Sequence, residues 1–207
     1  MLQVLFVRLP GVSSDLSRPP LAALHRQAGE ALTRHFLLRE GRDHRQEICR
    51  GAHGKPYFAA ENGLYFNISH SGDLVVAAFS DREVGIDIER RGRPRLAVAE
   101  RFFHPREVSR LRAVPAGSLL RLFADYWSVK ESFLKYLGTG LSRSLSTFRV
   151  EMDAASISLY ENDTRLPLHL HPCPVDDAYS CFACSESPVP PLVEEIPRAR
   201  LRVDNLP

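Results

Sequence analysis

Two short stretches of the sequence carry charged side chains at spacings that could bind a metal ion and a phosphate. In Gly85-Ile86-Asp87-Ile88-Glu89, alternation along a strand would place both carboxylates on one face and both isoleucines on the other. Further along, Glu131 and Lys135 lie one turn apart on a predicted helix and therefore share a face. Three carboxylates and an ammonium group suit a hard divalent cation that holds a phosphate.

Each pattern also has an ordinary structural interpretation. Asp87 and Glu89 could form the solvated face of an edge strand. Glu131 and Lys135 could be a surface ion pair, which is worth about 0.3–0.5 kcal/mol. The helix pair is less easily dismissed when a pair of strand carboxylates accompanies it, so we favour a site.

Composition narrows the class of protein. Of 207 residues 44% are apolar, and the net charge of +2 gives no reason to expect nucleic acid as a partner. No stretch approaches the roughly 18 apolar residues of a membrane span. Four cysteines in a chain of this size do not indicate a disulfide scaffold. We therefore expect a reduced, cytoplasmic protein.

The lysines are few, and the cysteines include one pair at a spacing found in metal sites. Only three of the 27 basic residues are lysines, namely Lys55, Lys130 and Lys135, so we look to them for ammonium chemistry. Cys181 and Cys184 match a C-x-x-C spacing, but a strand would place them on opposite faces. No second such pair completes a zinc site.

The sequence predicts four helices and eight strands. Helices are predicted over 20–38, 96–103, 105–113 and 118–137. Strands are predicted over 2–7, 64–68, 74–79, 84–88, 147–152, 156–160, 165–171 and 178–185, with a hairpin turn at 70–73. Residues 41–54 are predicted to be irregular, and the proline-rich tail after Pro188 is predicted to be loosely held. This pattern is α+β with antiparallel strands.

In combination, the motifs resemble the 4′-phosphopantetheinyl transferases of the surfactin-type (Sfp-like) class. Each block is weak by itself, but their order is specific and covers roughly residues 54–150. The blocks are Gly54-Lys55-Pro56, Phe66-Asn67-Ile68-Ser69-His70-Ser71-Gly72, Gly85–Glu89, Arg101-Phe102-Phe103, Trp127–Lys135 and Gly138-Thr139-Gly140-Leu141.

The resemblance implies a fold of two similar α/β halves related by a pseudo-two-fold axis. Each half would be an antiparallel sheet packed on a long helix, with the active site in the cleft between them. Residues 1–83 would form the N-terminal half, on the side of the adenine and 3′-phosphate of coenzyme A. Residues 84–207 would carry the metal site, the catalytic helix and the docking surface for a carrier protein.

The resemblance also implies roles for individual residues. Asp87, Glu89 and Glu131 would hold Mg²⁺ on the pyrophosphate, and Lys135 would neutralise charge on the bridging phosphate oxygen. Glu131 could instead be the general base, directly or through a metal-bound water.

The same resemblance gives a set of residues for coenzyme A. Ser69, His70 and Lys55 would contact its 3′-phosphate, and Arg26 would lie near the adenine. Family members usually carry a longer basic segment before the first helix, whereas about 20 residues precede it here. Part of the adenine and phosphate clamp is therefore expected to be missing or supplied by Arg8 or Arg18.

The expected reaction moves 4′-phosphopantetheine from coenzyme A to a serine of an acyl- or peptidyl-carrier protein and releases 3′,5′-ADP. Such carriers serve fatty-acid, polyketide or nonribosomal peptide synthesis. We expect a monomer that binds neither nucleic acid nor membrane. Two other classes of protein are the alternatives. One is a metal-dependent nuclease, which usually places E-x-K on one strand, and the other is a non-catalytic coenzyme A or carrier-binding protein, which should have lost acidic residues.

Carrier proteins are typically acidic around the modified serine, which suggests a basic docking segment. Arginines cluster beside Phe102 and Phe103, at positions 90, 91, 93, 95, 101 and 106. We predict that this segment docks the carrier, with Phe102 or Phe103 as an apolar anchor. A solvated basic link is the alternative, and docking would then move to the long helix near Leu119–Phe123.

Overall fold

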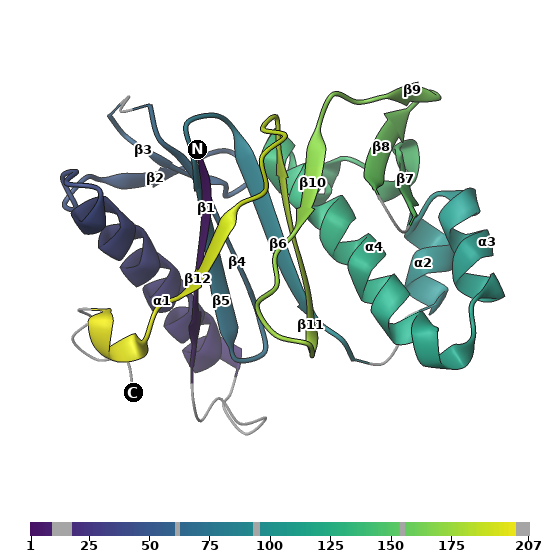
Figure 1. Cartoon of the computed structure of the whole chain (residues 1–207), viewed down its shortest axis with the longest axis horizontal. Coiled ribbons are helices and arrows are strands. Elements are labelled where there is room, and N and C mark those ends of the chain that lie inside the picture. The colour runs from purple at the N-terminus through teal and green to yellow at the C-terminus, as the bar shows by residue number, and fades with distance from the viewer. Residues whose placement is uncertain (10–17, 61–62, 93–95, 154–155, 202–207) are drawn as a thin grey trace.

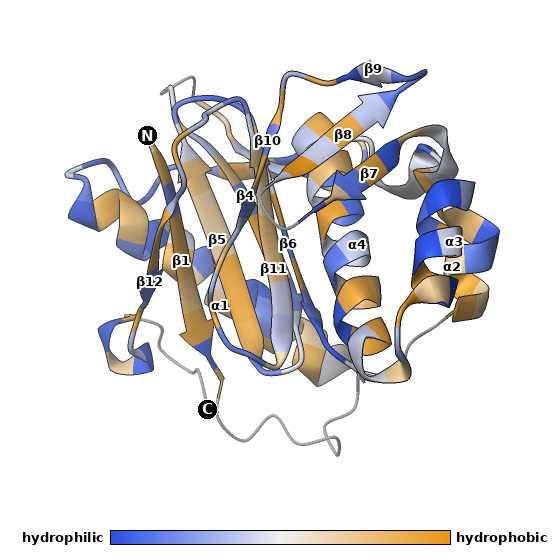
Figure 2. Ribbon diagram, turned by 45° about the vertical axis from the view of Figure 1, so that its right-hand side comes forward, coloured by the Kyte–Doolittle hydropathy of each residue, from blue (hydrophilic) through white to orange (hydrophobic). Residues whose placement is uncertain are grey.

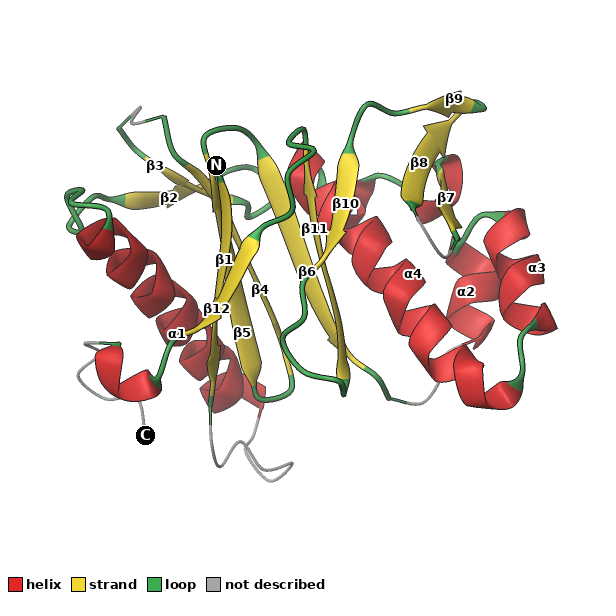
Figure 3. Ribbon diagram, in the orientation of Figure 1, coloured by secondary structure: helices red, strands yellow, loops and turns green. Residues whose placement is uncertain are grey.

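The computed structural model describes residues 1–9, 18–60, 63–92, 96–153 and 156–201. These residues form an α+β fold with two long helices outside and two sheets between them (Figure 1). Helix α1, Arg18–Arg39, covers the outer face of one sheet, and helix α4, Ala116–Leu137, covers the outer face of the other (Figure 3). The predicted fold class, with each sheet packed on a long helix, is confirmed.

The first sheet has the strand order β12-β1-β5-β4. Its strands are Leu2–Arg8 (β1), Tyr65–Ser71 (β4), Leu74–Ser80 (β5) and Leu192–Glu195 (β12). Alternation along β1 sends Leu5 and Val7 toward α1, and Val4 and Phe6 toward the second sheet. Strands β1 and β5 are mostly hydrophobic along their length in Figure 2, as burial on both faces requires.

The tail of the chain corrects two predictions. Strand β12 pairs in parallel with β1, from Gln3 opposite Leu192 to Phe6 opposite Glu195, so this sheet is not purely antiparallel. Ile196 and Leu201 are then buried in the core under α1. For the described part of the tail, the prediction that it is loosely held is wrong, because these apolar side chains fill space between β1 and α1. Residues 192–201 thus pack with residues 1–83 rather than with the segment that precedes them.

The second sheet has the order β10-β11-β6, with both neighbouring pairs antiparallel. Its strands are Val84–Arg90 (β6), His169–Pro172 (β10) and Tyr179–Ser185 (β11). Ile86 and Ile88 face the first sheet in a shared apolar core. Asp87 and the glycine at 85 lie on the other face, toward α4. The predicted alternation in this strand is therefore confirmed.

Strand β6 lies at the edge of its sheet, and side chains rather than a neighbouring backbone satisfy that edge. The backbone N–H of Ile86 donates to the Asn67 side chain at 3.0 Å, and that of Ile88 donates to the Ser69 hydroxyl at 3.3 Å. One step further, the N–H of Arg90 donates to the Ser71 hydroxyl at 3.0 Å. These three bonds join β4 to β6 without a strand pairing, and we call them the polar ladder. They fix the relative position of the two sheets.

Glycine at position 85 lets helix α4 lie directly on β6. A Cβ at that position would stand 2.0 Å from the Ser132 carbonyl oxygen and 2.3 Å from the Tyr136 amide nitrogen. Both are backbone atoms, so no side-chain rotation could relieve the contact. Gly138 adopts the left-handed conformation, with φ of 69°, and ends the helix as predicted.

The remaining elements lie beside α4 or beside the first sheet. Two short helices, Leu96–Phe102 (α2) and Pro105–Ala113 (α3), precede α4. A small sheet of Arg149–Met152 (β7), Ile157–Glu161 (β8) and Thr164–Arg165 (β9) follows it. Ile48–Arg50 (β2) and Pro56–Phe58 (β3) form a hairpin, whose first strand lies within the segment 41–54 that was predicted to be irregular. Single 3₁₀ turns occupy Gly140–Ser142, Leu145–Thr147 and Arg198–Arg200.

Lys130 is part of the core rather than of a site. Its ammonium is fully buried and lies 2.9 Å from a carboxylate oxygen of Glu107, which is also buried. It donates to the carbonyl oxygens of Leu145 at 2.8 Å and Phe148 at 2.9 Å. This pair joins α3, α4 and the start of β7. The expectation of ammonium chemistry at Lys130 is therefore wrong, because its donors are used in holding these elements together.

The contact at position 85 gives a stability prediction. Gly85→Ala should destabilise the protein by about 3 kcal/mol or more, because the added methyl group overlaps the α4 backbone. Chemical denaturation at neutral pH would measure this. The matched control is Gly117→Ala, where a Cβ meets nothing within 4 Å and an alanine favours the helix. Equal stability of the two variants would contradict this account of the packing.

Candidate functional site

The packing of α4 on β6 brings Lys135 against Asp87. The ammonium lies 2.7 Å from Asp87 Oδ1 and donates to the Ser69 hydroxyl at 2.7 Å. The same hydroxyl donates to Asp87 Oδ1 at 2.9 Å. The side chain of Lys135 is 27% exposed and that of Asp87 is 8% exposed. The sequence predicted both residues for the site, and the structure places them together.

Two carboxylate oxygens beside this contact are buried without a hydrogen-bond partner among the described residues. They are Asp87 Oδ2 and Glu131 Oε1. Burial, together with the neighbouring charges of Asp87 and Glu89, raises the pKa of Glu131 to about 7, against the opposing charge of Lys135. Buried carboxylate oxygens that repel one another favour either a proton or a cation between them.

The predicted metal ligands are only partly assembled. Among the described residues, no group of three His, Cys, Asp or Glu side chains is placed to hold a metal ion. One oxygen of Asp87 is already taken by Lys135 and Ser69, and Glu89 lies 3.5 Å from the Ser71 hydroxyl. The orphaned oxygens of Asp87 and Glu131 nevertheless fit Mg²⁺, which binds proteins through one or two carboxylates and completes its shell with phosphate and water.

His70 is held at the site by a second histidine. Strand β4 continues to Ser71, so His70 is a strand residue and not part of the predicted turn. Its ring stacks on that of His25 from α1, with the ring centroids 4.2 Å apart. The His25 Nε2 atom lies 2.9 Å from the Gly72 carbonyl oxygen. Burial, together with His25 and Lys135, lowers the pKa of His70 to about 4, so the ring is neutral at physiological pH.

These groups line a cleft of about 330 Å³ between α1, the β2–β3 hairpin, β4 and the end of α4. Glu131, Lys135 and His70 all reach it. Arg26 and Lys55, which the sequence predicted for coenzyme A, also line it. Arg26 is exposed and makes no hydrogen bond or ion pair within the described part of the chain. The cleft therefore gathers most of the predicted site residues from four separate stretches of sequence.

Ser69 and Lys55 both make contacts within the protein. Ser69 is buried behind the cleft, and its hydroxyl donates to Asp87 and accepts from Ile88 and Lys135, which uses its full hydrogen-bonding capacity. Lys55 reaches the cleft, but its ammonium donates to Glu83 at 2.5 Å and to the Tyr136 carbonyl oxygen at 2.8 Å. Both side chains hold the two sheets and α4 in position.

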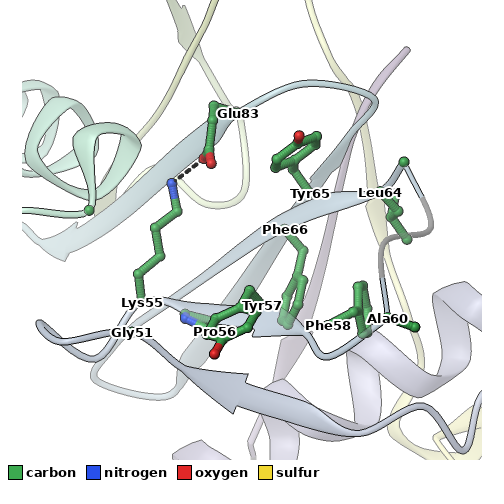
Figure 4. Close-up of a pocket in the computed structure, with 12 residues that line it drawn as sticks. Gly51, Lys55, Pro56, Tyr57, Phe58, Ala60, Leu64, Tyr65, Phe66 and Glu83 are labelled. Atoms are coloured by element: carbon green, nitrogen blue, oxygen red, sulfur yellow. Dashed lines mark hydrogen bonds and ion pairs between the residues drawn. The ribbon is translucent and has the colours of Figure 1, made fainter.

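A second, larger hollow of about 610 Å³ adjoins the cleft (Figure 4). Tyr57, Tyr65 and Phe66 line it, and Lys55 points across it toward Glu83. Although this hollow is the larger of the two, it is not the candidate site, because the buried carboxylates, His70 and Lys135 do not line it. Lys55 forms part of the wall between the two spaces.

Three cleft residues were missed from the sequence: His25, Arg50 and His53. His25 precedes Arg26, but a lone histidine on an apolar helix face carries no local signal. Arg50 and His53 lie in a segment whose charged composition suggested irregular structure. Only the pairing of β2 with β3 brings them to the cleft. The C-x-x-C cysteines fall into separate cores, Cys181 between the sheets and Cys184 beneath α4, as their alternation predicted.

The buried carboxylate of Glu131 gives a pH-dependent stability. Its native pKa of about 7 lies above the ordinary value of 4.5, so the stabilisation from its protonated form is complete below about pH 4.5 and is lost as pH rises through 7. Glu131→Gln is neutral at every pH. In metal-free buffer, its Tm should therefore gain on the unmutated protein by at least about 2 °C more at pH 8 than at pH 5.

Thermal melts at both pH values in the presence of a chelator would measure this. The matched control is Glu47→Gln, a change at an exposed glutamate outside the cleft, which should give equal differences in Tm at pH 5 and pH 8. If Glu131→Gln behaves like this control, the raised pKa of Glu131 is excluded.

Comparisons with known proteins give matches over much of the chain. The sequence profile described as the 4′-phosphopantetheinyl transferase superfamily matches residues 83–184. The 4′-phosphopantetheinyl transferase psf-1 of Bacillus pumilus is 37% identical, over 77% of this chain and 70% of its own length. The 4′-phosphopantetheinyl transferase Sfp of Bacillus subtilis (strain 168) is 34% identical, over 77% of this chain and 73% of its own length.

Two further matches differ in extent. The 4′-phosphopantetheinyl transferase gsp of Aneurinibacillus migulanus is 29% identical, over 89% of this chain and 86% of its own length. Among solved structures, the holo-[acyl-carrier-protein] synthase (AcpS) of Thermotoga maritima matches 49% of this chain and 61% of its own, with 21% identity and a TM-score of 0.39. Separately, no helix in the described ranges is long and apolar enough to cross a membrane.

Proposed function

Because the chain belongs to the 4′-phosphopantetheinyl transferase superfamily, we propose that it transfers 4′-phosphopantetheine from coenzyme A to a serine of an acyl- or peptidyl-carrier protein. The family expected from the motifs is confirmed by relatives that match most of the chain. Membership also makes the chain an enzyme of this class, which removes the grounds for a nuclease or a non-catalytic binding protein.

One observation carries the proposed chemistry. Asp87 and Glu131 each bury an oxygen that lacks a hydrogen-bond partner, beside an ammonium group that reaches a cleft lined by cations. Such a wall would be unfavourable for the protein alone, because like-charged carboxylates are desolvated together. It is suited to a cation and a diphosphate bound at the same time.

Asp87 and Glu131, assisted by Glu89, would hold Mg²⁺. When bound, the ion would supply positive charge to the diphosphate oxygens of coenzyme A. The donor set fits, because all three are carboxylates and Mg²⁺ prefers hard oxygen ligands. Ser69 and Lys135 hold the other oxygen of Asp87 and thereby fix the orientation of its carboxylate.

The reaction needs a base, a fixed phosphate and a stabilised leaving group. We assign Glu131 as the group that takes the serine proton, through the carboxylate oxygen that it does not give to the metal. The serine oxygen then bonds to the β-phosphorus, and the bond from that phosphorus to the bridging oxygen breaks. The electron pair leaves with 3′,5′-ADP, whose developing charge is neutralised by Lys135.

The other end of the cleft is proposed to bind the rest of coenzyme A. The neutral ring of His70, fixed by its stack on His25, can donate a hydrogen bond to a phosphate oxygen. Arg26 lies free on the α1 side of the same cleft, where the adenine is expected. Holding both ends of the nucleotide fixes the diphosphate between them, which supplies much of the rate.

The function is tested by the intact mass of apo carrier proteins after incubation with the protein, coenzyme A and Mg²⁺. A carrier should gain the mass of one phosphopantetheine on serine. Lys135→Met should lower kcat by about 10²-fold, with a smaller change in the KM for coenzyme A, because the charge it opposes develops during the reaction. The control is Arg82→Met, which removes a surface ion pair with Glu186 and should leave kcat unchanged.

No mass gain on carriers from fatty-acid, polyketide and peptide synthases would contradict the proposed function. A loss confined to KM in Lys135→Met would make Lys135 a ligand of the bound substrate rather than a stabiliser of the leaving group.

The carrier is proposed to dock beside α2. Phe102 is 41% exposed, and the Arg101 guanidinium lies 5.2 Å from the centre of its ring. Phe103 is excluded as an anchor, because it is 3% exposed and packs on Phe123 in the core. A hollow of about 200 Å³ lies between α4 and the end of β6, the strand that carries Asp87. Glu89, Arg90 and Trp127 are among the residues that line it. Arginines 93 and 95 of the predicted cluster lie outside the described residues.

Electrostatic docking has a kinetic signature. Added salt should raise the KM for the carrier and leave that for coenzyme A nearly unchanged, because exposed charges are screened beyond about 8–10 Å at physiological ionic strength. Arg101→Glu with Arg106→Glu should reproduce the loss at low salt. The matched control reverses two exposed charges before the β2–β3 hairpin, Arg42→Glu with Arg45→Glu. Equal effects of the two double variants would place the docking surface elsewhere, for instance near Leu119–Phe123.

A further inference from the structure

Of the three carboxylates proposed for the metal, Glu89 is the one whose position depends on the end of a strand. It lies one residue before the end of β6, which is an edge strand of its sheet. Alternation puts its side chain on the same face as that of Asp87, toward α4. Strand ends open more readily than strand centres, whereas a metal site needs its ligands placed to within about 0.5 Å. This end of β6 must therefore be held by other contacts.

Arg91, which follows β6, fastens the end of the strand to the neighbouring chain. Its backbone N–H donates to the Ala178 carbonyl oxygen at 2.8 Å. Its guanidinium donates through Nη1 to the Asp177 carbonyl oxygen at 2.6 Å and through Nε to the Ser180 hydroxyl at 3.2 Å. Arg91 is one of the arginines predicted to dock the carrier, yet these bonds turn its guanidinium toward the protein itself.

Ser180 is the direct neighbour of Glu89 in the sheet. The register of β11 on β6 pairs the two residues, and both side chains lie on the α4 side. The Ser180 hydroxyl donates to Asp125 Oδ1 at 2.5 Å, and its carbonyl oxygen accepts from the Ser128 hydroxyl at 3.0 Å. Helix α4 thus binds β11 at the position opposite Glu89.

Asp125 is the centre of this network. Besides the Ser180 hydroxyl, its carboxylate faces the Arg91 guanidinium at 3.9 Å and the Arg121 guanidinium at 3.6 Å. The side chain of Asp125 is 17% exposed and that of Arg121 is 71% exposed. The contacts with Ser180 and Arg91 are therefore the shielded ones, and they join α4 to both strands that meet beside Glu89.

The network lies on the same rigid element as the proposed base. Asp125 precedes Glu131 by six residues on α4. One helix therefore carries Glu131 and also holds the strand end that carries Glu89. The separation of these two carboxylates is then set by α4, provided that the bonds of Asp125 keep the end of β6 in place.

We propose that Asp125 is a positioning residue for the metal site, which holds the end of β6 against α4 through Ser180 and Arg91 and so directs Glu89 toward Asp87 and Glu131. This inference rests on the proposed function and deepens it by naming a group that supports the site without touching metal or substrate. The motif blocks of the sequence gave no indication of it, because Asp125 lies outside them.

Metal binding tests the inference without turnover. Mn²⁺, which also prefers oxygen ligands, is the probe, and electron paramagnetic resonance measures the free ion in the presence of coenzyme A and the absence of a carrier. Asp125→Ala should raise the Kd for Mn²⁺ by about tenfold, the lower end of the range for groups that orient a metal ligand. Asp125→Asn should recover part of this loss, because its amide oxygen can still accept from Ser180.

A second substitution shows whether Asp125 acts through Glu89. Adding Asp125→Ala to Glu89→Gln should raise the Kd for Mn²⁺ by less than about twofold beyond Glu89→Gln alone, because two changes in one chain of contacts are not additive. A further tenfold loss in the double variant would overturn the inference. In transfer assays with Asp125→Ala, the Mg²⁺ concentration for half-maximal rate should rise in parallel, while kcat at saturating Mg²⁺ changes by less than about threefold.

The matched control is Arg121→Ala, which removes the exposed cation beside the same carboxylate and should change the Kd for Mn²⁺ by less than about twofold. A network that serves stability alone would lower the Tm of Asp125→Ala and leave the Kd for Mn²⁺ unchanged. In that case the inference is wrong and the function stands. If Asp125→Ala does not fold, Arg91→Met tests the same network, and an unchanged Kd there has the same meaning.

The unmutated protein separates this inference from the proposed function. If it loads a carrier but binds no Mn²⁺ in the presence of coenzyme A, the inference alone fails. If it neither binds Mn²⁺ nor loads a carrier, both fail.

Discussion

The direct contact between strand β6 and the backbone of helix α4 determines the geometry of this molecule. At Gly85 the helix backbone occupies the space that a side chain would fill, so the two elements touch without a layer between them. Lys135 can therefore reach Asp87, and Glu131 comes close enough for the charge of Asp87 to raise its pKa. Any residue with a Cβ at position 85 would push the helix away and separate these charges.

The polar ladder supplies the second constraint. An edge strand normally exposes N–H groups that seek another strand. Here Asn67, Ser69 and Ser71 satisfy those of β6 and join the two sheets. Because Ser69 also holds Asp87 and Lys135, the bonds that join the sheets also orient the charges of the site. The same few side chains therefore hold the two sheets together and orient the charged groups of the site.

The role of each basic residue depends on how deeply it is buried. Lys130 is enclosed with Glu107 and holds α3 to α4, while Lys55 and Lys135 bridge elements at the wall of the cleft. An unpaired charge is tolerated only where solvent or a ligand can reach it. Arg26 and Arg50 satisfy that condition, since both are exposed and line the cleft. Among the residues that line the cleft, the cations that are free to meet a ligand are thus the exposed arginines rather than the lysines.

The sequence alone determined what depends on local periodicity and on motif order. Strand alternation predicted that the side chain of Asp87 points to the opposite face from those of Ile86 and Ile88. Helical spacing placed Glu131 and Lys135 on one face, and the ordered motifs indicated the family. The tertiary structure decided what depends on contacts between distant segments. Only the approach of β4 to β6 shows that Ser69 has no hydrogen bond left for a ligand, and only the pairing of β12 with β1 shows that the tail is part of the core. Such contacts join segments far apart in sequence, so no short pattern encodes them, and their geometry comes from packing.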